Sequence, residues 1–400
     1  MARSLNAHQI PKGWRYELLD KLAERCSGHT PSKSFPEYWN GGIKWISLAD
    51  SHRLDKGYVY ETDKEISTEG IKNSSANVHP AGTVVISRDA GIGKSGVMAE
   101  PMAVSQHFIA WKCDNEQKMN NWYLYNWLQF NKHEFERQAV GSTIKTIGLP
   151  FFKKLKIAAP PYLEQQKVAK ILSTWDKAIS TTERLIENST QQKKALMQQL
   201  LTSKKRLSGF DEKWSSYLIK ELESRNWIDL SRGNVISKKD IANYPGDYPV
   251  YSSSVKKKGL MGSYGKYMFD EELISWSVDG GGDFFHRTKH KFSVTNVSGY
   301  MRLKTEFLNY SFVAYQLQYL HGFHFFDYQS KAHPSVIRDL YSLYIPSLQE
   351  QQKIATVLTN ADKEIELLEQ QLADLQQEKK ALMQVLLTGK KRVVVDGEVV

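Results

Sequence analysis

A segment of 47 residues occurs twice in this chain of 400 residues. Residues 160–206 return without insertion or deletion at residues 346–392, and 24 of the 47 positions are identical. The identities include the Glu-Gln-Gln triplets that begin at Glu164 and Glu350, and the KKALMQ runs that begin at Lys193 and Lys379. Chance does not produce a match of this length. The chain therefore consists of two related halves.

Each copy of the repeat predicts a long amphipathic helix, because apolar residues recur at alternating steps of four and three. A helix of about 40 residues is roughly 60 Å long, which exceeds what the core of a small domain needs. Because both copies belong to one chain, we expect them to pair with each other. The predicted seam residues are Val168, Leu172, Trp175, Ile179, Ile186, Leu196, Leu200, Ile354, Leu358, Ile365, Leu368, Leu372, Leu382 and Leu386.

The ends of both predicted helices carry recognisable signals. Ser347 stands three residues before Glu350, the spacing of a capping box. The first copy has Pro161 at the position of Ser347, which suits the first turn because proline lacks an N–H that would have no partner there. Gly389 follows the last apolar residues of the second predicted helix, and basic residues follow both helices, in keeping with a C-terminal cap and the negative end of a helix dipole.

The segments outside the repeats predict two globular domains of mixed α and β structure, each rich in aromatic residues and short apolar runs. We divide the chain into domain 1 (1–159), the first long helix (160–207), domain 2 (208–345), the second long helix (346–392) and a tail (393–400). In domain 1 the pattern predicts strands over 83–87, 104–111 and 155–158, a loop over 88–94 and a helix over 121–135. In domain 2 it predicts strands over 273–278 and 297–303, a loop over 279–289 and a helix over 309–319.

Composition limits the class of protein. With 41% hydrophobic and 12% aromatic residues the chain can form folded cores, and it has neither a signal-peptide pattern nor an apolar run near 18 residues. We therefore expect a soluble cytoplasmic protein without membrane contact. Cys26 and Cys113 lack metal-site spacing and are expected to be reduced thiols. The net charge of +10 fits a polyanionic partner, but the excess is spread along the chain and no segment forms a basic arm.

The glycine-rich and histidine motifs do not predict an active site. A phosphate-binding loop that ends at Gly93 and Lys94 would need glycine where Arg88 stands, so we expect a tight hairpin with Arg88 and Lys94 at its rim. The Gly280 to Gly282 run lacks dinucleotide-binding spacing. His286 and His290 are four residues apart but have no third ligand nearby. We predict no catalytic residue, no metal site and no bound cofactor in this chain.

Binding is what remains, and basic and hydroxyl side chains in predicted loops are the candidates for contacts with DNA phosphates and bases. For any one of them, a solvated surface residue is the better interpretation. The set is more informative, because the two globular domains differ while the helices are kept. The candidates are Lys33, Arg53, Arg88, Lys94, Thr143, Lys145, Ser253, Lys256, Lys257, Lys258, Tyr264, Arg287, Lys289, Lys331 and His333.

The repeat resembles the conserved regions of the specificity subunit of type I restriction-modification enzymes. The resemblance rests on the pattern PxxxEQQK[VI]A and on KKALMQxLLTxKKR in both copies. It extends to the globular domains through residues 11–14 (PKGW), 37–39 (EYW), 43–46 (IKWI) and 86–94 (ISRDAGIGK). Domain 2 departs most from the family pattern.

This resemblance implies a subunit that recognises double-stranded DNA and has no catalytic activity of its own. Each globular domain would read one half of a split, asymmetric sequence. An antiparallel coiled coil of the two long helices would set the spacing of the half-sites and dock two methyltransferase subunits. Those subunits would methylate adenine with S-adenosylmethionine, and restriction subunits would supply translocation and cleavage driven by ATP, with Mg²⁺. Lys193 and Lys379 in the seam would then specify its register.

Two alternatives remain at this point. A coiled-coil adaptor whose aromatic-rich domains bind proteins or glycans would show the same repeat. A nuclease would require a spaced set of acidic residues and a lysine around Mg²⁺, and the adjacent Asp270, Glu271 and Glu272 do not form one.

Overall fold

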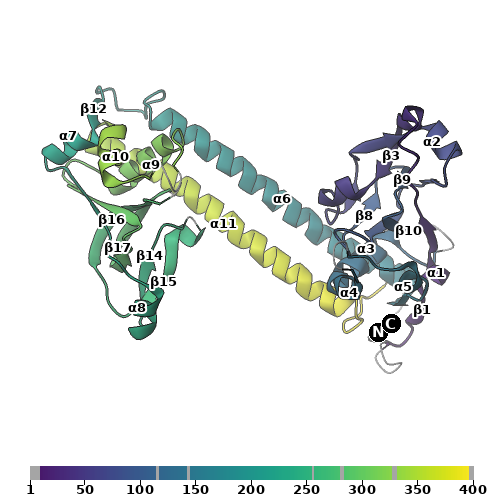
Figure 1. Ribbon diagram of the computed structural model, residues 1–400. Coiled ribbons are helices and arrows are strands. Elements are labelled where there is room, and N and C mark those ends of the chain that lie inside the picture. Colours follow the sequence, from purple (N-terminus) through teal and green to yellow (C-terminus); the bar gives the residue numbers. More distant parts are fainter. Residues whose placement is uncertain are drawn as a thin grey trace. The chain divides into compact units, whose positions relative to one another are not determined.

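The computed structural model describes residues 10–113, 117–141, 145–254, 256–279, 283–326 and 331–395 (Figure 1). The chain forms two compact units. Unit 1 comprises Met1–Thr182 and Leu372–Val400, and unit 2 comprises Glu183–Gln371. Each unit therefore contains one globular domain and one end of each long helix. The long helices are α6 (Tyr162–Leu200) and α11 (Leu348–Leu386), of 39 residues each.

The globular part of unit 1 is built on three sheets, with strand orders β2-β10-β7-β8-β4, β5-β3-β9-β6 and β1-β11. Most neighbouring strands are antiparallel, while the β3/β9 and β4/β8 pairs are parallel. In chain order its elements are β1 (Arg15–Leu18), α1 (Leu19–Leu22), β2 (Glu24–Ser27), η2 (Pro36–Tyr38), β3 (Trp39–Ile46), η3 (Leu48–His52), β4 (Tyr58–Val59), β5 (Lys64–Ile66), α2 (Thr68–Lys72), β6 (Val78–His79), β7 (Val84–Ser87), β8 (Ser95–Met98), β9 (Met102–Val104), β10 (Phe108–Lys112), α3 (Asn121–Phe130), α4 (Lys132–Gln138), α5 (Leu149–Lys153) and β11 (Lys156–Ala159).

The globular part of unit 2 is built on a six-stranded sheet with the order β13-β18-β16-β17-β14-β15 and a two-stranded sheet of β12 and β19. Within the larger sheet the β14/β17 pair is parallel. Its elements are β12 (Ser215–Leu218), α7 (Ile219–Ser224), β13 (Ile228–Arg232), α8 (Lys238–Asn243), β14 (Tyr248–Tyr251), η4 (Lys256–Gly259), β15 (Leu260–Tyr264), β16 (Phe269–Ser277), β17 (Phe284–Val294), β18 (Ser298–Leu303), α9 (Tyr310–His321), α10 (Pro334–Leu340) and β19 (Ser342–Ile345).

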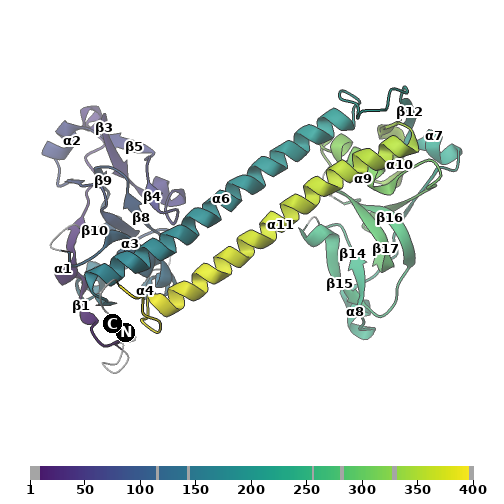
Figure 2. The ribbon, with the colours of Figure 1, turned by 180° about the vertical axis from the view of Figure 1, so that it is seen from behind.

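In both units one helix joins the sheet to the long helices through a shared apolar core. In unit 1, α3 contributes Tyr123 to a core that also holds Trp111 of β10 and Leu172 of α6. In unit 2, α9 contributes Phe312 to a core with Trp276 of β16. The views from front and back both show α9 beside the sheet and the ends of the long helices (Figures 1 and 2). The long helices are thus part of each domain core.

The predicted seam residues are all buried or half-buried. Val168, Leu172, Leu200, Ile354, Leu358 and Leu386 are buried, and the other predicted seam residues are half-buried. In unit 1, Lys379 pairs with Asp176 at 2.5 Å and Arg392 pairs with Glu164 at 2.6 Å. The register of these two pairs makes the helix ends antiparallel. Unit 2 repeats the arrangement with the pairs Lys193–Asp362 and Arg206–Glu350.

The expected capping box at Ser347 is wrong, because Glu350 has other partners. One carboxylate oxygen accepts a hydrogen bond from Nε of Arg206 at 2.7 Å. The other accepts bonds from Nη2 of Arg206 at 2.8 Å and from the indole N–H of Trp214 at 3.1 Å. Glu350 is 1% exposed, and a buried carboxylate needs such donors more than a helix terminus does.

Three predicted elements differ from the structure. The helix over 121–135 breaks at Asn131, whose side-chain amide donates to the carbonyl of Trp127 at 2.8 Å and so competes with the helix backbone. The strand over 104–111 is the end of β9 and most of β10, separated by a turn in which the N–H of Phe108 donates to the carbonyl of Ser105 at 3.1 Å. The loop over 279–289 includes the start of β17, whose polar residues hid the strand. The predicted strands over 83–87, 155–158, 273–278 and 297–303 and the helix over 309–319 are present.

Candidate nucleic-acid interface

In unit 1 the loop after β7 is pinned to the segment before α5. The carbonyl of Arg88 accepts a hydrogen bond from the N–H of Ile147 at 2.9 Å. The carboxylate of Asp89 lies 2.6 Å from Nδ1 of His107 and also accepts a bond from the hydroxyl of Thr146. Two chain segments far apart in sequence therefore meet at one corner of the domain.

Unit 2 builds the same corner after β16. The carbonyl of Val278 accepts a hydrogen bond from the N–H of Ala332 at 3.0 Å. The carboxylate of Asp279 pairs with Lys331 at 2.8 Å, where unit 1 uses His107 and Thr146. The Gly280 to Gly282 run that follows lies outside the described residues.

A short sequence signal underlies both corners. Each strand ends in Ser-x-Asp, and the serine hydroxyl donates to the carbonyl of that aspartate, at 2.8 Å for Ser87 and 3.2 Å for Ser277. These turns are local side-chain to backbone motifs that hold a loop in shape. The predicted candidates Lys145 and Lys331 both lie beside these corners. Lys331 takes the place of Thr146, because each bonds to the corner aspartate one residue before the N–H that the corner binds, and Lys145 lies one residue earlier. The structure thus shows the same pair of loops in both domains, although the sequences of the two domains are only weakly similar there.

Beside the corner of unit 1 lies a cleft of about 480 Å³ with three lysines on its wall. Lys94 and Lys145 were predicted, and Lys132 of α4 was not. The glycine-containing loop 90–92 and Glu136 complete much of the lining. Lys145 is exposed at the cleft, so its ammonium group is available to a ligand. Because cations outnumber the one carboxylate, the lining favours an anion.

Two of these lysines are partly committed to the domain itself. Nζ of Lys94 donates to the carbonyl of Ser51 at 3.1 Å, which ties the hairpin loop to η3. Lys132 forms an ion pair with Asp55 at 2.6 Å. The hairpin itself is confirmed, because the N–H of Ser87 donates to the carbonyl of Lys94 at 2.8 Å. Lys94 is therefore half-buried against the domain instead of standing free at the rim.

The two predicted arginines of unit 1 are also half-buried. Nε of Arg53 lies 3.4 Å from the carboxylate of Asp50, and Nε of Arg88 lies 3.9 Å from that of Asp89. The side chain of Arg88 is 20% exposed, so its expected place at the rim of the hairpin is wrong. Lys33 is exposed before η2, and Thr143 lies outside the described residues.

In unit 2 the predicted lysine run forms the turn η4 between β14 and β15. Lys257 and Lys258 have left-handed backbone angles, with φ of 50° and 52°, and Gly259 follows with φ of 86°. Both lysine side chains are exposed, and Lys258 pairs with Glu366 of α11 at 2.7 Å. Ser253 is half-buried nearby in sequence, and the side chain of Lys256 lies outside the described part of the chain.

Arg287 was predicted to lie in a loop, and this prediction is wrong. It belongs to β17 and is 5% exposed. Its Nε donates to the hydroxyl of Ser275 at 2.9 Å, and its Nη2 donates to the carbonyl of Lys258 at 2.6 Å. Burial lowers the pKa of the Arg287 guanidinium to about 10, which leaves it charged at neutral pH.

The remaining candidates of unit 2 are spread over several elements. Tyr264 is half-buried with its ring centroid 6.3 Å from that of Tyr244, and Lys289 is exposed on β17. Nδ1 of His333 accepts the N–H of Ser335 at 3.4 Å at the start of α10, and burial lowers its pKa. His333 therefore has a structural role as a helix cap.

Sequence reasoning also missed two lysines of unit 2 that lie over tyrosine rings. Nζ of Lys266 is 3.9 Å from the ring centroid of Tyr244, and Nζ of Lys291 is 4.8 Å from that of Tyr267. The signal was the density of tyrosines beside lysines at 244–267, which favours cation–π contacts once the strands pair.

The two spaced histidines do not share a ligand. Nε2 of His286 lies 2.6 Å from the carboxylate of Glu272, whereas Nε2 of His290 lies 3.2 Å from the hydroxyl of Tyr251. A register shift between Glu271 and Leu273 separates their environments. Among the residues that the structure describes, no group of three or more histidine, cysteine or acidic side chains could hold a metal ion.

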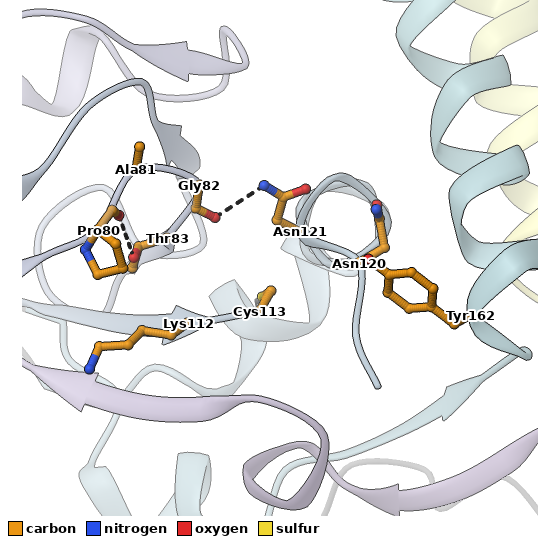
Figure 3. A pocket seen from close by; sticks show the side chains of 9 residues that line it. All are labelled: Pro80, Ala81, Gly82, Thr83, Lys112, Cys113, Asn120, Asn121 and Tyr162. Carbon is orange, nitrogen blue, oxygen red and sulfur yellow. Dashed lines mark hydrogen bonds between the residues drawn. The ribbon is translucent and has the colours of Figure 1, made fainter. Parts of the chain in front are cut away.

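A second, smaller pocket of unit 1, of about 200 Å³, lies between the turn before β7 and the start of α6 (Figure 3). Asn121 points across it and donates to the carbonyl of Gly82 at 3.3 Å. Lys112 on its wall pairs with Glu24 at 2.9 Å. The described lining residues offer a thiol and amides but no carboxylate or imidazole, so they form no acid–base pair.

A family model described as the type I restriction modification DNA specificity domain matches residues 11–189 and again residues 212–377. The two matches cover both globular domains and most of both long helices. The chain belongs to this family of DNA specificity domains. Its internal repeat is a repeat of the specificity domain itself, which explains why both units contain the same corner.

Curated relatives are similar to part of this chain. The type I restriction enzyme MjaIX specificity subunit of Methanocaldococcus jannaschii is 29% identical over 190 residues, which are 47% of this chain and 42% of that protein. The HindI specificity subunit of Haemophilus influenzae is 26% identical over 184 residues, 45% of this chain and 38% of that protein. The matches thus span about two fifths of the length of these two relatives.

A solved structure shares the fold over nearly the whole chain. The S subunit of a type I restriction-modification system from M. genitalium superimposes with a TM-score of 0.64 at 15% identity, covering 96% of this chain and 97% of that one. At this identity the likeness shows the fold alone. The specificity domains and long helices described above are therefore the fold of that subunit. None of the described helices is long and apolar enough to cross a membrane.

Proposed function

We propose that this chain recognises double-stranded DNA as the specificity subunit of a type I restriction-modification complex, reading a split, asymmetric sequence with one globular domain per half-site. The observation that carries the proposal is the duplicated specificity domain with its duplicated corner. Each corner gathers two loops next to a lysine, Lys145 in unit 1 and Lys331 in unit 2. Basic side chains on pinned loops suit contacts with phosphates and base edges.

The long helices support the second part of the proposal, which is that they dock two methyltransferase subunits. Lys194 and Ala195 in unit 2 and their repeat equivalents Lys380 and Ala381 in unit 1 are exposed. The helices also carry the closest internal repeat, so the two units present similar faces. Two similar faces fit two copies of one partner.

The chemistry in this proposal belongs to other subunits. The methyltransferase subunits would bind S-adenosylmethionine and methylate adenine, and restriction subunits would use ATP and Mg²⁺ for translocation and cleavage. This chain would contribute sequence readout and assembly. The lysines beside its corners and in its cleft would position the duplex, because phosphate contacts fix register while base contacts specify sequence.

The test is methylation by the chain assembled with its methyltransferase partner, on a plasmid library with randomised sequence. We expect methylated adenines within one bipartite sequence and a two-part footprint whose affinity falls steeply with salt. Methylation without sequence preference would contradict the proposal. Neutralising Lys94, Lys257 and Lys258 together should weaken DNA binding, whereas a protein-binding or glycan-binding adaptor would keep its affinity. Cleavage of DNA by the purified chain alone with Mg²⁺ would contradict the absence of catalysis.

A further inference from the structure

The η4 turn of unit 2 has an unfavourable backbone. Lys257 and Lys258 have φ of 50° and 52° and ψ of 38° and 34°, which is the left-handed helical region. Residues with a Cβ rarely occupy it, and then as single residues, not in succession. Such conformations persist where the surroundings over-determine them, and they cluster at functional sites. The turn therefore needs support from the rest of the unit.

That support comes from below the turn. The guanidinium of Arg287 donates to the carbonyl of Lys258 at 2.6 Å. The N–H of Ser252 donates to the carbonyl of Gly259 at 2.8 Å. A Cβ at Gly259 would lie 2.9 Å from the carbonyl oxygen of Ser252, so this close approach requires glycine. The buried side chain of Arg287 thus holds the carbonyl of Lys258, which lies between the second left-handed lysine and the glycine.

Arg287 carries its charge without an acidic partner. Among the described residues no carboxylate lies within ion-pairing distance of its guanidinium. Its contacts include the hydroxyl of Ser275, the carbonyl of Lys258 and two aromatic rings, those of Tyr251 at 3.7 Å and Phe285 at 4.8 Å from the guanidinium carbon to the ring centroid. A buried cation is normally paired, because desolvation is costly. The aromatic rings offset part of that cost, and the uncompensated charge leaves the surface above it attractive to an anion.

The two lysines of the turn have different roles. Lys258 is tied to Glu366 of α11 at 2.7 Å, so its ammonium group helps to fix the turn against the helix. Lys257 is exposed and forms no ion pair within the described residues. Of the two, Lys257 is the side chain that is free to meet a ligand.

We propose that Arg287 is a positioning residue that holds the left-handed turn so that Lys257 contacts a backbone phosphate of the DNA, and that Arg287 itself does not touch DNA. The inference rests on the proposed function and deepens it, because it names one contact of the half-site read by domain 2 and the residue that prepares it. A buried guanidinium cannot reach a phosphate, but the carbonyl it binds fixes where the lysine points.

The salt dependence of binding separates positioning from contact. Log Kobs against log salt has a slope of about −0.9 for each phosphate contact, so Lys257→Ala in the methyltransferase-bound chain should reduce the magnitude of the slope by about 0.9. Arg287→Met, which keeps an apolar side chain in the cavity, should give the same reduction. The double variant should show no further reduction. Lys304→Met, which removes one charge from an exposed lysine after β18, serves as the control and should leave the slope unchanged.

A rescue experiment adds a readout that misfolding would not give. Glycine accepts left-handed angles without strain, so Lys258→Gly in the Arg287→Met background should restore most of the lost slope, and Lys258→Ala should not. Additive slope losses for Lys257→Ala and Arg287→Met would mean that Arg287 contacts DNA and would overturn the inference, as would an unchanged slope for Lys257→Ala. If the unsubstituted complex methylates without sequence preference, the proposed function fails. A specific complex with additive or unchanged slopes refutes the positioning role alone.

Discussion

The two units share a buried glutamate–arginine ion pair, which we call the clasp, but they differ in their cationic surfaces. In unit 1 the buried Glu164 binds Arg392 at 2.6 Å, and in unit 2 the buried Glu350 binds Arg206 at 2.7 Å. Each clasp joins the start of one copy of the repeat to the end of the other. The equivalent glutamines, one residue further on, each accept an N–H at the cap of α3 or α9, at 2.8 and 2.9 Å. The repeated residues are therefore those that join helices to domains.

The cationic side chains, by contrast, stand on unrelated scaffolds. Unit 1 places Lys94, Lys132 and Lys145 around a cleft, while unit 2 raises Lys257 on a strained turn above Arg287. Only the Ser-x-Asp corner is common to both surfaces. The ion pairs that join the long helices to the domains are the same in both units, so those residues are kept together. The cationic side chains on the candidate interface differ between the units, so the sequence there is free to change. Four predictions test this contrast, from the largest expected effect to the smallest.

Breaking a clasp should cost the most stability. Arg206→Ala leaves the carboxylate of Glu350, 1% exposed, without its main partner, so we expect the free energy of unfolding to fall by about 3 kcal/mol. Arg392→Ala should cost a similar amount in unit 1, where Glu164 is 2% exposed. Urea unfolding of the full chain measures both. Costs below about 1 kcal/mol would show that the clasps do not stabilise the units that contain them.

The seam should reveal an asymmetry between the units. Asp362 accepts the hydroxyl of Tyr315 at 2.5 Å in addition to Lys193, whereas one carboxylate oxygen of Asp176 has no hydrogen-bond partner among the described residues. Lys379→Ala should therefore destabilise by about 1 to 2 kcal/mol and Lys193→Ala by about half as much.

The Tyr315→Phe substitution is the control for that asymmetry. In the Lys193→Ala background it removes the second donor to Asp362 and should raise the cost to that of Lys379→Ala. Equal costs for the two single variants, measured by urea unfolding, would contradict the expected difference.

The cleft of unit 1 should contribute unequal phosphate contacts. Lys145→Ala should reduce the magnitude of the salt slope of DNA binding by about 0.9, because Lys145 is exposed at the cleft. Lys94→Ala should reduce it by less, since its ammonium group already serves the carbonyl of Ser51. The ordering is read from filter-binding titrations between low and moderate salt. A larger loss for Lys94→Ala would reverse the assignment.

The pH dependence of stability should also differ between the units. Burial, helped by the charge of Lys112, lowers the pKa of His79 in unit 1 below its ordinary value of 6.5. The unfolded chain then binds the proton more readily, so this contribution to stability is complete above pH 6.5 and is lost as pH falls below it. His79→Leu should flatten the melting temperature between pH 7.5 and 5.5. His333→Asn, which keeps a capping side chain on α10, is the control and should leave most of the dependence in place.

The two long helices could be predicted well from the sequence, and the reason is physical. A heptad repeat reports burial directly, and duplication supplies an internal comparison. Both long helices were therefore identified correctly, and the predicted seam residues are buried or half-buried. The partners of Lys193 and Lys379 could not be assigned, because Asp362 and Asp176 look like ordinary surface acids until the antiparallel register is known. The capping box at Ser347 failed for the same reason.

The candidate site was harder to predict, because the role of a loop residue depends on the distant segments of the chain that it contacts. Lys94 and Lys145 lie on one cleft although 50 positions separate them, and Lys132 joins them from a helix. Arg287 resembled a loop cation, since its neighbours in sequence are polar, yet a register shift in β16 and β17 accompanies its burial beneath the turn. No local pattern distinguishes an arginine that contacts a ligand from one that positions a lysine.

The central claim is that one pair of long helices carries two globular domains that recognise their half-sites independently. A domain exchange tests this claim most directly. Residues 10–159 would be replaced by the corresponding segment of another specificity subunit, with both clasps kept, and the methylated sites of the assembled complex mapped by sequencing. The account predicts that one half of the bipartite sequence changes while the other half and its spacing stay the same. A change in both halves, or in neither, would contradict it.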